Sequence, residues 1–302
     1  MSHETRQSLE KDGFRALVSV DASRVVLRSR HGTEMLPAFP EIGAGAAQLP
    51  DATALDGELV VWDAAGRLAF EQLQNRLQRR GARAARAAAE WPAHFVAFDL
   101  LRLSGTDTTG WPYWRRRAAL ESVFAARRLS APWVLCPSTT DQDTVREWLT
   151  WASAGMEGVL FKRLDGVYEP GVRGWRKYKV RETTEAIVGA VTGTLAAPTG
   201  LLLGRFDDSG RLQYAGRTTT LAQTASRTVA GLLVPAQGGH PWQGLSFSAG
   251  WGSREMLDVT LVEVGVDVAR DASGRWRHPA RLHRARPDLS PADVPGLSSP
   301  PR

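Results

Sequence analysis

The sequence predicts an α+β protein in which an antiparallel-sheet domain is followed by a small β-barrel. Two observations predict the first domain: turn-forming residues separate short apolar stretches between 14 and 70, and a nearly continuous apolar run at 93–101 suits a buried strand. A third observation predicts the barrel, because short strands alternate with turns after about residue 184. At 302 residues, the chain is long enough for two ordinary cores.

The first domain, 1–182, is expected to begin with a polar segment that places Lys11 in a loop before the first strand. Its remaining elements follow in chain order. They are strands at 14–20, 24–30, 54–62, 67–70 and 93–101, helical segments at 70–90 that break at Gly81, helices at 114–128 and 142–154 around a strand at 134–137, and strands at 158–164 and 175–180.

The second domain, 183–290, is expected to be all-β apart from one helix at 221–233. Its predicted strands lie at 185–191, 200–206, 211–217 and 257–268. The sequence Asp207-Asp208-Ser209-Gly210 is typical of a hairpin turn. Five or so short strands with one helix fit a small barrel such as an OB-fold. The Pro- and Ser-rich residues 291–302 predict a flexible tail.

Composition excludes several classes of protein. No apolar run is long enough to span a bilayer, and the polar residues 1–10 lack the apolar core of a secretory signal, so we expect a cytoplasmic protein. A single cysteine, Cys136, excludes a disulfide framework and a cysteine-based zinc site. The net charge of +6 and the pI near 10 indicate a polyanionic partner.

Lysine is rare in this chain, which makes each lysine informative. Of 38 basic residues only four are lysines, namely Lys11, Lys162, Lys177 and Lys179, so 38 − 4 = 34 are arginines. Arginine cannot replace lysine where an amine must lose its proton. Lys11, beside Asp12-Gly13, is therefore a candidate amine nucleophile, and the alternative is a solvated turn lysine.

Four further features carry chemistry. Glu58 lies inside an apolar strand, where a carboxylate is costly unless it binds a cation, a ribose hydroxyl or an arginine. Phe98 could stack on a base or be a core residue, and Glu157 opens an apolar strand. Lys177 and Lys179 are two residues apart on a strand, so both side chains point the same way and can clamp phosphate. Each feature alone is more often structural than functional.

Taken in order, these segments resemble the motifs of ATP-dependent DNA ligases in the covalent nucleotidyltransferase superfamily, in particular the bacterial ligases associated with end joining. The resemblance covers nearly the whole chain and implies an adenylation domain followed by an OB-fold domain. It is carried by residues 10–15 (Glu-Lys-Asp-Gly-Phe-Arg), Ser29-Arg30, Asp56-Gly57-Glu58, Phe98-Asp99, 157–162, 175–179 and Arg277-His278-Pro279 with 280–286.

The resemblance implies that Lys11 attacks the α-phosphate of ATP to form lysyl-AMP. It assigns the other roles by position: Arg15 to the ribose, Arg30, Arg173, Lys177 and Lys179 to phosphates, Glu58 to the ribose or a metal, Phe98 to adenine, Glu157 to Mg²⁺ or Mn²⁺, and Arg284 and Arg286 to the leaving pyrophosphate. The implied partners are duplex DNA with a nick or break and an end-joining DNA-end-binding protein, and we expect a monomer.

The first motif departs from the family pattern, which is Lys-x-Asp-Gly. Here Lys11 directly precedes Asp12, so an ungapped match places Glu10 at the nucleophile position. One residue of extended chain is about 3.3 Å and reverses the side-chain face, and we expect a loop to absorb this slip. Because the family also has a segment upstream of this motif, we interpret the chain as a shortened member.

Three functions remain open from sequence. The first is an active DNA ligase, and the second is a catalytically impaired relative that binds nicked or broken DNA. The third is a nucleotidyltransferase of the RNA-ligase or capping type. Covalent retention of AMP separates the first from the second, and a preference for a 3′-OH ribonucleotide at the nick identifies an RNA-directed member.

Overall fold

The computed structural model divides into two compact units, Met1–Lys179 and Val180–Arg302. The backbone, but not the side chain, is described for Lys11, Met156, Glu157, Arg181, Arg254, Asp258 and Val259. The described residues are 4–11, 13–150, 156–172, 174–179, 181–238, 240–242, 254–267, 270–271 and 273–297.

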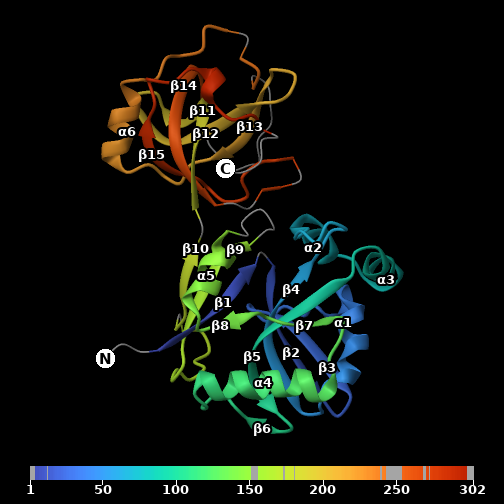
Figure 1. The fold of residues 1–302 in the computed structure, drawn as a ribbon. Helices are drawn as coiled ribbons and strands as arrows, with labels where there is room; N and C mark the ends of the chain where they lie inside the picture. Colours follow the sequence, from blue (N-terminus) through green and yellow to red (C-terminus); the bar gives the residue numbers. More distant parts are fainter. Residues whose placement is uncertain are drawn as a thin grey trace. The chain divides into compact units, whose positions relative to one another are not determined.

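The first unit contains two separate sheets, which are predominantly antiparallel (Figure 1). The larger sheet has the order β3-β2-β4-β5-β6, and β7 adds to β5 in parallel. Its strands are β2 (Phe14–Asp21), β3 (Arg24–Ser29), β4 (Thr53–Val61), β5 (Ala93–Leu103), β6 (Thr106–Asp107) and β7 (Trp133–Leu135). The smaller sheet has the order β10-β9-β1-β8. Its strands are β1 (Thr5–Lys11), β8 (Ser138–Thr139), β9 (Met156–Arg163) and β10 (Arg176–Lys179).

Helices cover one face of each sheet and leave the other face for the site. The main core joins the larger sheet to residues of η1, α1, η2, α2 and α4, and a smaller cluster joins α5 to Leu9, Val159 and Phe161 of the smaller sheet. The helices are η1 (Leu36–Ala38), α1 (Pro40–Gly45), η2 (Ala46–Gln48), α2 (Phe70–Arg76), α3 (Gly81–Glu90), α4 (Tyr113–Arg127) and α5 (Gln142–Leu149).

The second unit is built on an antiparallel sheet of the order β13-β12-β11-β14-β15 (Figure 1). Two apolar clusters form the core of this unit, one around Val188, Leu203 and Val264 and one around Trp242. Its elements are β11 (Arg181–Thr194), β12 (Ala197–Phe206), β13 (Leu212–Arg217), α6 (Gln223–Ala230), β14 (Arg254–Asp267), β15 (Arg281–Ala285) and η4 (Pro291–Asp293).

The predicted fold class is confirmed: an α+β unit with antiparallel sheets precedes a unit whose described residues form five strands and one α-helix. No helix in the described part of the chain is both long and apolar enough to cross a membrane. The strands agree with the alternating patterns from which they were predicted.

Three local predictions were wrong. Lys11 does not lie in a loop, because residues Thr5–Lys11 form β1 and pair along β9. Residues 67–70 do not form a strand: Leu68 makes an isolated bridge to Trp62 and Phe70 begins α2. Within the predicted tail, residues 291–297 are ordered against the second unit, since Val294 is buried and the Leu297 amide donates to Phe206 O at 2.9 Å.

Candidate active site

The larger sheet contributes Arg15, Glu58 and Phe98 to the face opposite its core. Arg15 lies directly across from Glu58 in the β2–β4 ladder. Their chain neighbours Ala16 and Leu59 point into the main core, so strand alternation turns Arg15 and Glu58 to the other face. Two sequence-predicted nucleotide contacts are therefore adjacent side chains on one surface.

A β-bulge presents Phe98. The β4–β5 ladder pairs Gly57 with Ala97 and Asp56 with Asp99, so Phe98 is an extra residue between two paired positions. Bulges re-aim side chains and are common beside active sites. The bulge is anchored by Asp99, whose buried carboxylate accepts from Arg116 Nε at 2.8 Å and Nη2 at 3.0 Å.

Arg15 is held by a buried carboxylate. Its Nε and Nη2 donate to Asp56 at 3.2 and 2.7 Å, and the Tyr168 hydroxyl donates to the same carboxylate at 3.0 Å. Burial raises the pKa of Asp56, and Arg15 opposes that rise. The guanidinium also lies 5.7 Å from the Phe98 ring centroid and 5.0 Å from that of Trp175. Arg15 is thus fixed beside the predicted adenine-stacking ring.

Lys162 is the one lysine that the site assignment from sequence left out. Its ammonium is fully buried, donates to Phe98 O at 3.1 Å, and lies 3.9 Å from the Trp175 ring and 4.8 Å from the Tyr113 ring. Burial lowers the pKa of Lys162 to about 8, although Asp99 opposes the shift. Because Lys162 belongs to β9 and Phe98 to β5, this contact joins the site faces of the two sheets. The sequence held one signal for this position: Lys162 alternates with Phe161, which placed the two side chains on opposite faces of the strand.

The smaller sheet contributes Glu10 and the two clamp lysines. Glu10 is paired with Gly158, which is paired in turn with Lys179, so the three form one row across β1, β9 and β10. Lys177 lies two residues before Lys179 on β10 and forms an ion pair with Glu10. Alternation places Glu10, Lys177 and Lys179 on one face of the sheet, as predicted for the two lysines.

A second bulge lies at the end of the same row. The β1–β9 ladder pairs Glu10 with Gly158 but Lys11 with Met156, which leaves Glu157 as the extra residue. The side chains of Lys11 and Glu157 lie outside the described residues, and so does all of Arg173. Arg30 follows β3 in an exposed turn at the edge of the larger sheet. No group of three potential metal ligands occurs in the described part of the chain.

Gly13 is required by close packing. A Cβ atom at this position would lie 2.4 Å from Leu59 O and 2.6 Å from Glu58 Cγ. Gly13 therefore lets the chain that enters β2 approach the backbone of β4 closely beside Glu58. Asp12, which precedes it, lies outside the described residues. The glycine in the first motif serves this close approach.

The two C-terminal arginines predicted to orient pyrophosphate belong to the second unit. Arg284 donates to Glu263 at 2.9 Å, and its side chain is 65% exposed. Arg286 is 16% exposed and contacts three carboxylates, those of Asp288, Glu263 and Glu185. These hydrogen bonds and charges raise the pKa of Arg286, with Asp288 the largest stabilising contributor.

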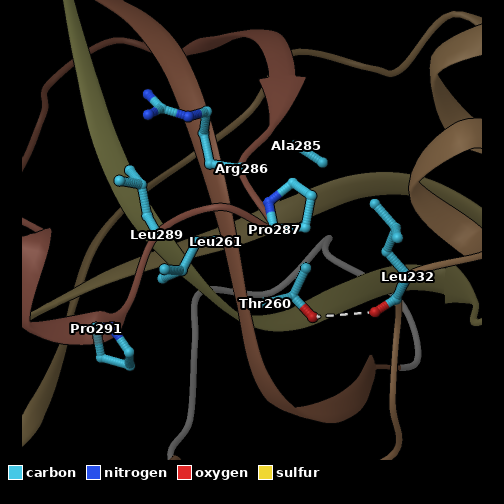
Figure 2. A pocket seen from close by; sticks show the side chains of 8 residues that line it. All are labelled: Leu232, Thr260, Leu261, Ala285, Arg286, Pro287, Leu289 and Pro291. Atoms are coloured by element: carbon cyan, nitrogen blue, oxygen red, sulfur yellow. Dashed lines mark hydrogen bonds between the residues drawn. The ribbon is translucent and has the colours of Figure 1, made fainter.

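A pocket of about 330 Å³ lies beside Arg286 in the second unit (Figure 2). Figure 2 shows the Arg286 guanidinium extending away from the apolar side chains of Leu232 and Pro287. The remaining lining residues are Thr260, Leu261, Ala285, Leu289 and Pro291. Among these lining residues only Arg286 and Thr260 have polar side chains, so the pocket is mostly apolar apart from the one predicted pyrophosphate contact.

Residues 4–180 match the family model described as "ATP dependent DNA ligase domain". This match covers more than half of the chain, and the chain therefore belongs to the ATP-dependent DNA ligase family, as the resemblance of its motifs implied.

Among characterised relatives, the chain is 36% identical to DNA ligase C2 of Mycolicibacterium smegmatis, over 92% of this chain and 84% of the relative. It is 33% identical to the multifunctional non-homologous end joining DNA repair protein LigD of Mycobacterium tuberculosis, over 94% of this chain and 36% of the relative. The solved ligase domain of M. tuberculosis LigD aligns with a TM-score of 0.51 and 29% identity, covering 96% of this chain and 92% of that domain.

Proposed function

We propose that this chain is an ATP-dependent DNA ligase that seals nicks or breaks in duplex DNA through lysyl-AMP on Lys11. The observation that carries the proposal is the contact from Lys162 to Phe98 O, because it joins the two sheets that bear the motifs. Adenine, ribose and phosphate contacts predicted from distant parts of the sequence then belong to one site. Phosphoryl transfer depends mainly on such positioning and on charge neutralisation.

Strand register supports two of the assigned roles. Glu58 and Arg15 lie together for the ribose, and Lys177 and Lys179 share a face for the phosphates. We assign the Phe98 ring, which is 7% exposed, to adenine. We assign Arg30, Arg173, Arg284 and Arg286 to the phosphates and pyrophosphate, and Glu58 and Glu157 to a divalent cation. Carboxylate oxygens suit Mg²⁺ or Mn²⁺, which would neutralise charge on the transferring phosphate.

Lys11 is proposed as the nucleophile because it ends β1 beside the clamp face and directly follows Glu10 in that strand. Neutralising cations around an amine also lower its pKa, so that part of it is unprotonated near neutral pH. The β1–β9 ladder shifts register at this residue, which makes it the point where the one-residue slip of the motif can be taken up.

The substrate and partners follow from charge and from the relatives. A net charge of +6 favours binding to phosphate backbones without base readout. Relatives with 33–36% identity are named as DNA ligases or as an end-joining repair protein. We therefore propose nicked or broken duplex DNA as the substrate of a monomer that acts in the cytoplasm, and a DNA-end-binding protein as its partner in end joining.

One observation favours a second function, which is DNA binding without self-adenylation. Glu10 occupies the nucleophile position in an ungapped match, and its side chain lies on the clamp face. A carboxylate cannot form a phosphoramidate with AMP. If Lys11 is misplaced, the chain would hold a nick but would not charge itself.

Intact mass after incubation with ATP and Mg²⁺ distinguishes these functions. We expect wild type to gain the mass of one AMP, Lys11→Arg to gain none, and Lys11→Arg combined with Glu10→Lys to regain it, because the new amine then stands in the regular row. Loading of Lys11→Arg alone would place the nucleophile elsewhere. Nicked-DNA binding without loading in any variant would establish the second function, with the Tm of each variant confirming that it is folded.

A further inference from the structure

Glu10 and the clamp lysines meet across a glycine. The row Glu10, Gly158, Lys179 has no side chain at its centre, so the carboxylate on β1 can reach over β9 toward β10. Gly158 is required there, because a Cβ atom would lie 2.0 Å from Tyr178 O. The backbone itself therefore opens a path between Glu10 and Lys177.

The ion pair that uses this path is asymmetric. The Glu10 side chain is 10% exposed, whereas the Lys177 side chain is 39% exposed. Glu10 Oε1 binds the Lys177 ammonium, while Oε2 is buried and accepts no hydrogen bond from the described residues. A half-satisfied buried carboxylate depends strongly on its one cationic partner. Lys177, by contrast, is accessible to a second anion.

We propose that Glu10 sets the nucleotide affinity of this site by competing with the phosphates of ATP for Lys177. The inference rests on the proposed function in one respect, namely that Lys177 binds phosphate. An incoming triphosphate must displace the Glu10 carboxylate or share the ammonium with it, and it approaches a like charge in doing so. Glu10 is a positioning residue that neutralises Lys177 while no nucleotide is bound.

The competition makes a prediction opposite to that for an ordinary structural carboxylate. Loss of a purely structural ion pair would loosen β10 and weaken nucleotide binding. Removing a competitor instead leaves Lys177 with one anionic partner fewer and tightens binding. The gain should be larger when the triphosphate carries no metal, because the repulsion from Glu10 is then unscreened.

The test measures the dissociation constant of ATP by isothermal titration calorimetry in EDTA, where no transfer occurs, and again with Mg²⁺. Glu10→Gln should bind ATP about 5- to 30-fold more tightly than wild type in EDTA. Glu10→Asp, which keeps the charge, should stay close to wild type. The matched control Glu147→Gln removes an exposed charge from α5 of the same unit and should change the constant less than about twofold.

A double-mutant cycle with Lys177→Met identifies the target of Glu10. The gain in ATP affinity caused by Glu10→Gln should be clearly smaller in the Lys177→Met background. Equal or weaker binding by Glu10→Gln, or an equal gain in both backgrounds, would overturn the inference. AMP loading is read separately: tighter binding without loading in any variant refutes the ligase proposal alone, whereas loading with unchanged affinity refutes the competition alone.

Discussion

The two units handle their charges differently. In the first unit, three ionic groups behind the site are buried: Asp99 and Arg116 are at most 1% exposed, and Lys162 lies among aromatic rings. In the second unit, the predicted pyrophosphate contacts Arg284 and Arg286 form a network with carboxylates near the surface. These buried groups are fixed before any ligand arrives, whereas the arginines near the surface can exchange partners, as Lys177 of the first unit can.

This difference separates charges that fix the backbone from charges that are available to bind a ligand. A buried pair costs several kcal/mol to desolvate and persists only with full hydrogen bonding, so it fixes the backbone around it. A solvated arginine contributes little to stability, and it can exchange a carboxylate for a phosphate at small cost. The buried groups of the first unit therefore fix the geometry of its site, and the exposed arginines of the second unit remain able to bind other anions. Three comparisons test this division, from the largest expected effect to the smallest.

Asp99→Asn should cause the largest loss of stability, because it leaves Arg116 buried without its counter-ion. Breaking one side of a buried pair typically costs about 3–5 kcal/mol. The Phe98 bulge would lose its anchor as well, so ATP affinity should fall further than the lost stability explains. Urea unfolding measures the free energy, and ATP titration at a temperature where the variant is folded measures the affinity.

The comparison for this prediction is Asp143→Asn, which removes an exposed carboxylate paired with Arg146 on α5. Its unfolding midpoint should stay near that of wild type, because exposed pairs contribute little. A similar, small effect of both substitutions would show that the Asp99–Arg116 pair does not fix the site.

Lys162→Met should change the pH dependence of stability. The folded-state pKa of Lys162 is about 8, below its ordinary value of 10.5, so the unfolded chain binds more protons between these two values. Wild-type stability therefore rises with pH through this window, by at most about 1.4 kcal/mol per pH unit. The Met variant lacks this gain. The free energy of unfolding of wild type minus that of the variant should therefore rise by about 1–2 kcal/mol from pH 8 to pH 9.5.

Chemical denaturation at several pH values measures this difference. The range ends at pH 9.5 because tyrosines titrate above it, and burial has raised the pKa of Tyr168 to about 12. A constant difference between wild type and Lys162→Met would mean that Lys162 is charged and compensated in the folded state throughout the range.

How far the sequence predicted this fold depended on where each strand lies. β2, β4 and β5 alternate or run apolar against one core, and pattern reasoning found each within a few residues. β1 was missed because its buried side chains include the polar residues Gln7, Ser8 and Glu10. A strand enclosed between two neighbours at a polar site has no hydrophobic period by which to recognise it.

The same limit applies to the site. Motif order predicted that Arg15 and Glu58, and likewise Lys177 and Lys179, act together, and the strand register places the members of each pair close to one another. It could not predict the bulges at Phe98 and Glu157, because an extra residue in one strand is visible only in its pairing with the next. The contact between Glu10 and Lys177 depends on that register and on an intervening glycine.

Within the second unit, substitutions of Arg284 and Arg286 test which of the two arginines is available to bind a ligand anion, and we expect their effects to be the smallest. Arg284→Gln should shift the Tm by less than about 2 °C, because its exposed side chain has one carboxylate partner. Arg286→Gln should lower the Tm more, since it leaves Asp288, Glu263 and Glu185 with fewer cations.

If Arg284 is the charge available to pyrophosphate, its substitution should also slow AMP loading while nicked-DNA binding persists. Differential scanning fluorimetry and timed intact mass give the two readouts. A larger Tm loss for Arg284→Gln, with loading unaffected, would reverse the roles of the two arginines.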